Sequence, residues 1–191
     1  MSIKLKNVKT EYNEAYQKAL HWFFAFPDSE MNLSSLSNKL KISKTTAGRV
    51  IKKLVNEKFL KVNQIGRTLR ITCNKNHIYN YSKKVSYNLM VIYESGIIEK
   101  IHELIKNPRA IILFGSYRKG DDIETSDIDI AVEIIDNEGL RITEIGIIPQ
   151  LGHRENVKVN LHTFSRNKVD INLFSNIANG IILEGFLEVK I

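Results

Sequence analysis

Apolar side chains recur at helical spacing in three segments near the start of the chain. Between residues 11 and 26 they return every three or four positions, which predicts an amphipathic helix. A short helix is expected over residues 33–40 behind Asn32 as its N-cap, and a third runs from its N-cap Ser43 to about residue 57. The apolar stripe of the third helix consists of Ala47, Val50, Ile51 and Leu54.

After the third helix the spacing changes to that of strands. Residues 59–62 and 68–72 predict two short strands, and Gly66 supplies a permissive backbone for the turn between them. Residues 75–87 are polar and aromatic without a clear period, so we expect a linker there. Residues 89–105 predict one more helix.

The second half of the chain alternates apolar runs with loops, which predicts an α+β protein. A continuous apolar run at residues 110–114 predicts a buried strand, residues 128–135 and 157–164 predict two more strands, and residues 173–180 predict a last helix. The predicted division is a first domain over residues 1–74, a linker and connecting helix over 75–107, and a second domain over 108–191.

The net charge of +7 is divided unevenly along the 191 residues. Residues 1–90 carry 17 Lys and Arg against 5 Asp and Glu, a balance of +12, whereas residues 91–191 carry 11 against 16, a balance of −5. This asymmetry favours two modules with different partners. The basic half suits a polyanion, and the acidic half could hold a metal ion.

Composition also bears on the compartment. No apolar run approaches the roughly 20 residues of a membrane-spanning helix, and the first residues lack the apolar segment of a signal peptide. Cys73, the single cysteine, has no partner for an intrachain disulfide and no neighbours for a metal site, so we expect a partly buried strand residue. We therefore expect a cytoplasmic protein without a membrane partner.

The helices and hairpin of the first half resemble a winged helix-turn-helix, a module of many microbial transcription regulators. The resemblance covers residues 10–74 and is most specific in LSSLSNKLKISKTTAGRVIKKLVNEKFLKV and the following NQIGRTLRIT. It implies that the third helix lies in the major groove of duplex DNA, where Thr45 and Arg49 reach base edges. The implied DNA-binding residues are Lys44, Thr45, Arg49, Lys52, Lys53 and Arg67, with Arg70 as a further phosphate contact.

Other interpretations of the first half stay open. Winged helices also serve as dimerisation or protein-docking modules, and a Lys-rich helix face is often only a solvated surface. Because regulators of this kind often read paired half-sites, the resemblance also favours a homodimer.

The segment FGSYRKGDDIETSDIDIAV carries the clearest chemistry of the second half. Gly115 follows a buried strand and lets the backbone approach a phosphate, and Ser116 adds a hydroxyl donor. Asp127 and Asp129 occupy alternate positions of the next strand, so their carboxylates project from one face. Two hard oxygen ligands side by side suit Mg²⁺, which takes further ligands from water and substrate phosphates. A phosphate cradle beside a magnesium site is what nucleotidyl transfer requires.

This segment resembles the signature of the minimal nucleotidyltransferases, relatives of kanamycin nucleotidyltransferase and DNA polymerase β. The matching residues are Gly115-Ser116, Arg118 through Gly120, and Ser126-Asp127-Ile128-Asp129, and the likeness extends from about residue 93 to residue 191 and includes NIANGIILEG. It implies a mixed sheet flanked by helices, Mg²⁺ on Asp127 and Asp129, and ATP or another nucleoside triphosphate as substrate. Nucleotide binding is implied for Gly115, Ser116, Arg118 and Ser126.

The resemblance fails at one position. The family usually has a third carboxylate on a later strand, and here the matching position is Asn160. An amide is a weak ligand and no general base at neutral pH. His162 on the same strand face could take the proton instead, Glu155 in the preceding loop is a second substitute, or the site binds nucleotide without turnover.

Two functions therefore remain. The first is an enzyme that transfers AMP from ATP to an acceptor hydroxyl. The resemblance implies that the acceptor is either a small molecule or a tyrosine of a small helical toxin in a toxin–antitoxin pair. The second is a DNA-binding regulator whose degenerate transferase domain senses nucleotide. Retention of Asp127 and Asp129 favours the enzyme, whereas Asn160 favours the sensor.

Overall fold

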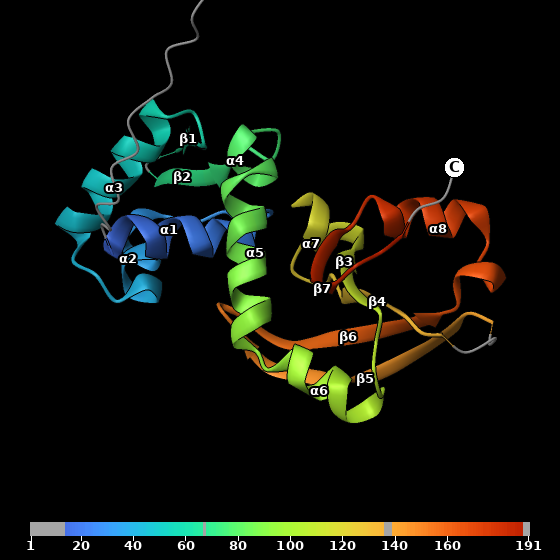
Figure 1. The fold of residues 1–191 in the computed structure, drawn as a ribbon. Helices are drawn as coiled ribbons and strands as arrows, with labels where there is room; N and C mark the ends of the chain where they lie inside the picture. The colour runs from blue at the N-terminus through green and yellow to red at the C-terminus, as the bar shows by residue number, and fades with distance from the viewer. Residues whose placement is uncertain (1–13, 67, 136–138, 189–191) are drawn as a thin grey trace, which may run out of the picture.

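The computed structural model describes residues 14–66, 68–135 and 139–188 (Figure 1). Its first part has three helices followed by a two-stranded antiparallel hairpin, as the apolar spacing predicts. Asn32 Oδ1 accepts the Ser35 N–H at 2.8 Å and Ser43 Oγ accepts the Thr46 N–H at 3.1 Å, so both predicted N-caps are confirmed. The elements are α1 (Glu14–Ala25), α2 (Leu33–Leu40), α3 (Lys44–Asn56), β1 (Leu60–Ile65) and β2 (Thr68–Cys73).

The helices of this first part bury the apolar stripes that predicted them. Phe23 and Phe24 of α1 pack with the apolar face of α3, and Phe59 closes the same core from the start of the hairpin. The predicted start of the first helix at residue 11 lies outside the described residues. Cys73 is half-buried at the end of β2, as expected.

Two predictions for the connecting segment are wrong. The expected linker contains α4 (Ile78–Tyr81) and the start of α5 (Lys83–Glu94), and the expected single helix breaks before α6 (Ile97–Leu104). Gly96 adopts φ 74° at this break, a conformation that glycine tolerates without strain. The helical period of α5 was hidden because polar residues, Lys84 and Asn88, occupy buried positions where apolar ones are expected.

The second part is a five-stranded sheet in the order β5-β6-β4-β3-β7. β4 and β6 run parallel and the other neighbours antiparallel, so the predicted mixed sheet is confirmed. The exposed edge strand β5 was not predicted. The bounds are β3 (Ala110–Phe114), α7 (Gly115–Lys119), β4 (Ile128–Glu133), β5 (Arg141–Leu151), β6 (Arg154–Phe164), a 3₁₀ turn (Arg166–Lys168), α8 (Ile171–Ala178) and β7 (Ile181–Gly185).

Helices cover the two faces of the sheet unequally. Ile111 and Leu113 of β3 pack with α5, α6 and Tyr117 of α7, whereas Ile112 and Phe114 lie on the other face with α8. This division follows from the alternation of side chains along a strand. Figure 1 shows α5 standing between the first three helices and the sheet. The core on the α5 face continues into the N-terminal helices, which ties the two parts of the chain together.

Candidate functional site

The site forms where β3 ends and α7 begins. Gly115 has φ +70°, and a Cβ atom there would lie 2.7 Å from Oδ2 of Asp129 on the neighbouring strand. Only a residue without a side chain leaves this space beside the carboxylate. The backbone of the Gly-Ser turn therefore lies directly next to Asp129, the second of the two predicted aspartates.

Strand register brings the sequence-predicted acidic and amide residues together. Asp129 pairs with Asn160 across the parallel β4–β6 ladder, and Asp127 directly precedes β4. Asn160 Nδ2 donates to Asp127 Oδ2 at 3.4 Å and to Asp129 Oδ1 at 3.3 Å. The amide thus bridges the two carboxylates through its N–H groups.

His162 lies two residues beyond Asn160 on the same strand face. Its Nε2 is 3.3 Å from Asp129 Oδ1, and its ring meets Phe114 edge to face at 4.9 Å between centroids. Nδ1 is buried without a hydrogen-bond partner among the described residues. In a neutral ring the proton therefore belongs on Nε2, where it is donated to Asp129. In this arrangement His162 orients Asp129 and does not itself accept a proton.

A pocket of about 240 Å³ adjoins Gly115 between α7 and α8. Arg118 and Lys119 line it from α7, Asn176 lines it from α8, and Asn179 lines it from the residue directly after α8. Neither cation forms an ion pair with any residue in the described part of the chain, so both remain available to an anionic ligand.

The two predicted serines differ in availability. The Ser126 hydroxyl accepts the Ile123 N–H at 2.9 Å and closes the turn before Asp127, so it fixes the backbone there. The Ser116 hydroxyl makes no hydrogen bond to the residues that the structure describes, and it is free to donate.

The donor set suits one hard cation. Within the described residues, no group of three or more His, Cys, Asp or Glu side chains is arranged to hold a metal ion. The protein offers Asp127 and Asp129, and the other ligands must come from water or a bound molecule. Mg²⁺ is bound in this way, through one or two carboxylates plus substrate phosphates. The glycine beside Asp129 leaves room for such a ligand, so the residues fit the ion.

A buried polar network supports the loop that leads into the site. The Asp122 carboxylate accepts from Arg154, lies 3.3 Å from Lys84 Nζ and accepts from Asn88 at 2.8 Å. Arg154 also donates to the Tyr117 hydroxyl at 2.7 Å. Burial lowers the pKa of Lys84 and the Asp122 charge opposes this shift. No pattern in the sequence predicts this network, because its members come from four separate segments.

Glu155 does not belong to the site. It lies within β6, opposite Gln150 of β5, so its placement in a loop was wrong. Five residues separate it from Asn160 along the strand, which at about 3.3 Å per residue is about 17 Å.

A second surface lies on the N-terminal part. Lys44, Thr45, Arg49, Lys52 and Lys53 are all exposed on α3. Lys53 Nζ lies 4.7 Å over the Tyr16 ring, and the other three cations make no ion pair with described residues. Arg67 lies outside the described residues. The α3 surface lies on the side of the molecule away from the sheet (Figure 1).

Comparisons with known proteins agree with the geometry of the second part. The family model described as "Polymerase beta, Nucleotidyltransferase" matches residues 97–188. No curated protein matches the chain. None of the described helices is both long and apolar enough to cross a membrane. The family match supports a polymerase β-like nucleotidyltransferase domain in residues 97–188, and with it a nucleotidyltransferase-type activity in general.

Proposed function

We propose that the protein is a Mg²⁺-dependent nucleotidyltransferase that moves AMP from ATP to an acceptor hydroxyl. The observation that carries this proposal is the contact between Gly115 and Asp129. It places a backbone able to receive phosphates directly beside a carboxylate able to hold a divalent ion. The unpaired cations of α7 at the adjoining pocket support a polyphosphate ligand.

The residues then have separate roles. Gly115 and Ser116 receive the triphosphate, Arg118 balances its charge, and Asp127 and Asp129 hold Mg²⁺. Ser126 fixes the backbone before Asp127. When bound, Mg²⁺ would neutralise the charge of the phosphates and orient them for in-line attack.

Transfer joins the acceptor oxygen to the α-phosphorus and breaks the bond from that phosphorus to the bridging oxygen of the leaving pyrophosphate. The acceptor proton must leave as well. Asn160 cannot take it, so His162 is the proposed acceptor, either directly or through water. This role requires that the ring proton move from Nε2 to Nδ1, so that Nε2 gives up its hydrogen bond to Asp129 and can accept a proton.

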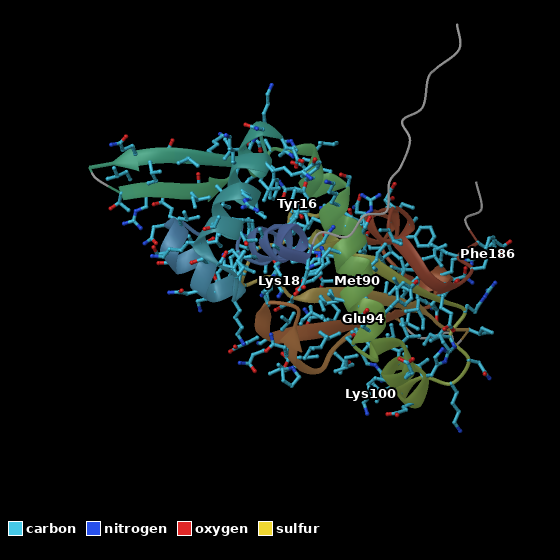
Figure 2. All side chains as sticks on the ribbon, turned by 90° about the vertical axis from the view of Figure 1, so that its left-hand side faces the viewer. Tyr16, Lys18, Met90, Glu94, Lys100 and Phe186 are labelled. Atoms are coloured by element: carbon cyan, nitrogen blue, oxygen red, sulfur yellow. The ribbon has the colours of Figure 1, made fainter. Side chains whose placement is uncertain are left out.

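We also propose that the N-terminal part is a winged helix-turn-helix that binds duplex DNA through α3. The exposed cations of α3 and the projecting hairpin support this proposal (Figure 2). A DNA-binding transferase of this kind fits an antitoxin role, with a tyrosine of a small helical toxin as acceptor and a homodimer on paired half-sites.

A second function is favoured by one observation. Asn160 donates to both carboxylates and His162, with its proton on Nε2, donates to Asp129, so neither of these two side chains accepts the proton of the acceptor hydroxyl in this arrangement. The protein would then be a DNA-binding regulator that senses a nucleoside triphosphate without turnover.

Labelled triphosphates distinguish the two functions. Purified protein, Mg²⁺ and lysate from the source cells are incubated with one labelled triphosphate at a time, and label is followed on proteins and metabolites. Enzyme activity predicts label on a discrete product, absent with Asp127→Asn/Asp129→Asn.

Retention of triphosphate without transfer would identify the sensor. Calorimetry in which the double variant binds Mg²⁺-ATP as tightly as the unmodified protein would contradict the metal site in both functions.

A further inference from the structure

The oxygens of the two carboxylates are not equally free. Asp127 Oδ2 and Asp129 Oδ1 face Asn160 and accept its amide N–H groups, and Asp129 Oδ1 also meets His162. Asp129 Oδ2 faces Gly115 instead. The oxygens that make no hydrogen bond to the described residues are therefore Asp127 Oδ1 and Asp129 Oδ2. One oxygen of each carboxylate thus keeps its lone pairs for a cation.

The β6 side of the carboxylates is closed to a cation. An amide N–H group is a donor and cannot coordinate a metal. Turning the Asn160 amide to present its oxygen would supply one neutral ligand and would break both hydrogen bonds to the carboxylates. On the side of the site that faces β6, the carboxylates therefore meet the N–H donors of Asn160.

Charge leads to the same conclusion. The protein supplies a charge of −2 through the two carboxylates, which one divalent ion neutralises, and the triphosphate of the proposed function adds its own negative charge beside Gly115 and not beside Asn160. A second divalent ion beside the first would be repelled four times as strongly as one unit charge repels another at the same distance. Sites that hold two ions about 4 Å apart bridge them with more anionic ligands than this pair provides. Asn160 adds none.

We propose that the site holds one divalent ion for each bound nucleotide, on the carboxylate oxygens that Asn160 does not contact, and that a second ion is missing because Asn160 stands where a third carboxylate would be needed to bind it. This inference rests on the proposed nucleotide site and specifies its metal content. It assigns Asn160 a role that does not depend on whether transfer occurs.

The test counts ions and does not use activity. Folded protein is equilibrated with Mn²⁺ and a saturating ATP analogue that carries a methylene group between the α- and β-phosphates. Bound Mn²⁺ is then measured by electron paramagnetic resonance. We expect one ion per chain for the unmodified protein and two for Asn160→Asp, which adds a carboxylate opposite Asp129. Asn160→Ala removes the amide without adding charge and should remain at one.

Each outcome has a distinct meaning. Two ions in the unmodified protein would overturn the inference and leave the proposed function standing. One ion in folded Asn160→Asp would refute the role given to Asn160. No ion and no nucleotide in the folded, unmodified protein would overturn the proposed function together with the inference.

Discussion

Gly115 shows how one residue without a side chain can determine a site. Its positive φ places the backbone where any Cβ would collide with Asp129 Oδ2. A carboxylate and a backbone turn can therefore lie close enough to act on the same ligand. Sequence motif and geometry agree here, because the constraint is local to β3, α7 and the adjacent strand.

We predict that Gly115→Ala abolishes Mg²⁺-dependent binding of ATP. The methyl group would displace the Asp129 carboxylate, and the positive φ would cost about 1–2 kcal/mol of stability. Calorimetry with Mg²⁺-ATP measures the first effect and urea unfolding the second.

Gly66→Ala is the matched control. Gly66 has φ +60° in the hairpin turn, and no described residue has an atom within 4 Å of a Cβ placed there. This variant should lose a similar amount of stability and keep its nucleotide affinity. Unchanged ATP binding in Gly115→Ala would refute the role given to Gly115.

At the scale of elements, α3 separates two kinds of residue. Val50 and Leu54 are buried against α1, whereas Arg49 and Lys52 are exposed on the opposite side. The buried stripe orients the helix, and the basic face remains free for a polyanion. The amphipathic pattern of α3 thus leaves its basic face exposed for the proposed contact with DNA.

We predict that Arg49→Ala weakens binding to duplexes selected from a random pool by about 1–3 kcal/mol and broadens the selected sequences. Lys52→Ala should instead weaken all duplexes alike and reduce the slope of log affinity against log salt by about 1. Fluorescence anisotropy at several salt concentrations measures both.

Lys100→Ala is the control, since Lys100 is exposed on α6 and paired with Glu103. Its duplex affinity should equal that of the unmodified protein. Absence of any duplex binding at low salt would contradict the DNA-binding proposal as a whole.

At the scale of the whole molecule, specific contacts join α1 of the N-terminal part to α5 and to the sheet. Arg154 donates from the start of β6 to the Ala25 carbonyl at the end of α1, at 3.2 Å. His21 of α1 stacks on Tyr87 of α5, with ring centroids 4.1 Å apart. Burial is the main cause that lowers the pKa of His21 to about 4, and the neighbouring His153 is the second cause. Burial also lowers the pKa of His153.

These histidines predict a loss of stability in mild acid. The unfolded chain takes up protons on His21 below its ordinary pKa of about 6.5, whereas the folded chain does so only near pH 4. The free energy of unfolding should therefore fall as the pH decreases from 6.5 towards 4. Glu94 is exposed on α5 (Figure 2) and lines the same pocket as both histidines. The pKa of His21 is lowered with this carboxylate present.

His21→Phe keeps a ring against Tyr87 and removes the titration. Its loss of stability between pH 7 and pH 5, measured by urea unfolding, should be smaller by about 1–2 kcal/mol than that of the unmodified protein. An equal loss in the two proteins would show that His21 does not carry this dependence.

The sequence by itself determined the local elements and the chemistry at the end of β3. Helical spacing, the caps Asn32 and Ser43, and the alternation of apolar runs with loops depend on neighbours in the chain, so they could be predicted. The Gly-Ser turn and the alternating aspartates predicted a site for the same reason.

Only the tertiary structure decided which residues meet across the fold. The helical period of α5 was hidden by Lys84 and Asn88. These polar side chains are buried because Asp122, distant in sequence, pairs with Lys84 and accepts a hydrogen bond from Asn88. The donor role of Asn160 depends on the parallel register of β4 and β6, which no local pattern records. The sequence shows that an amide replaces a carboxylate, and the register shows which carboxylate oxygens that amide occupies.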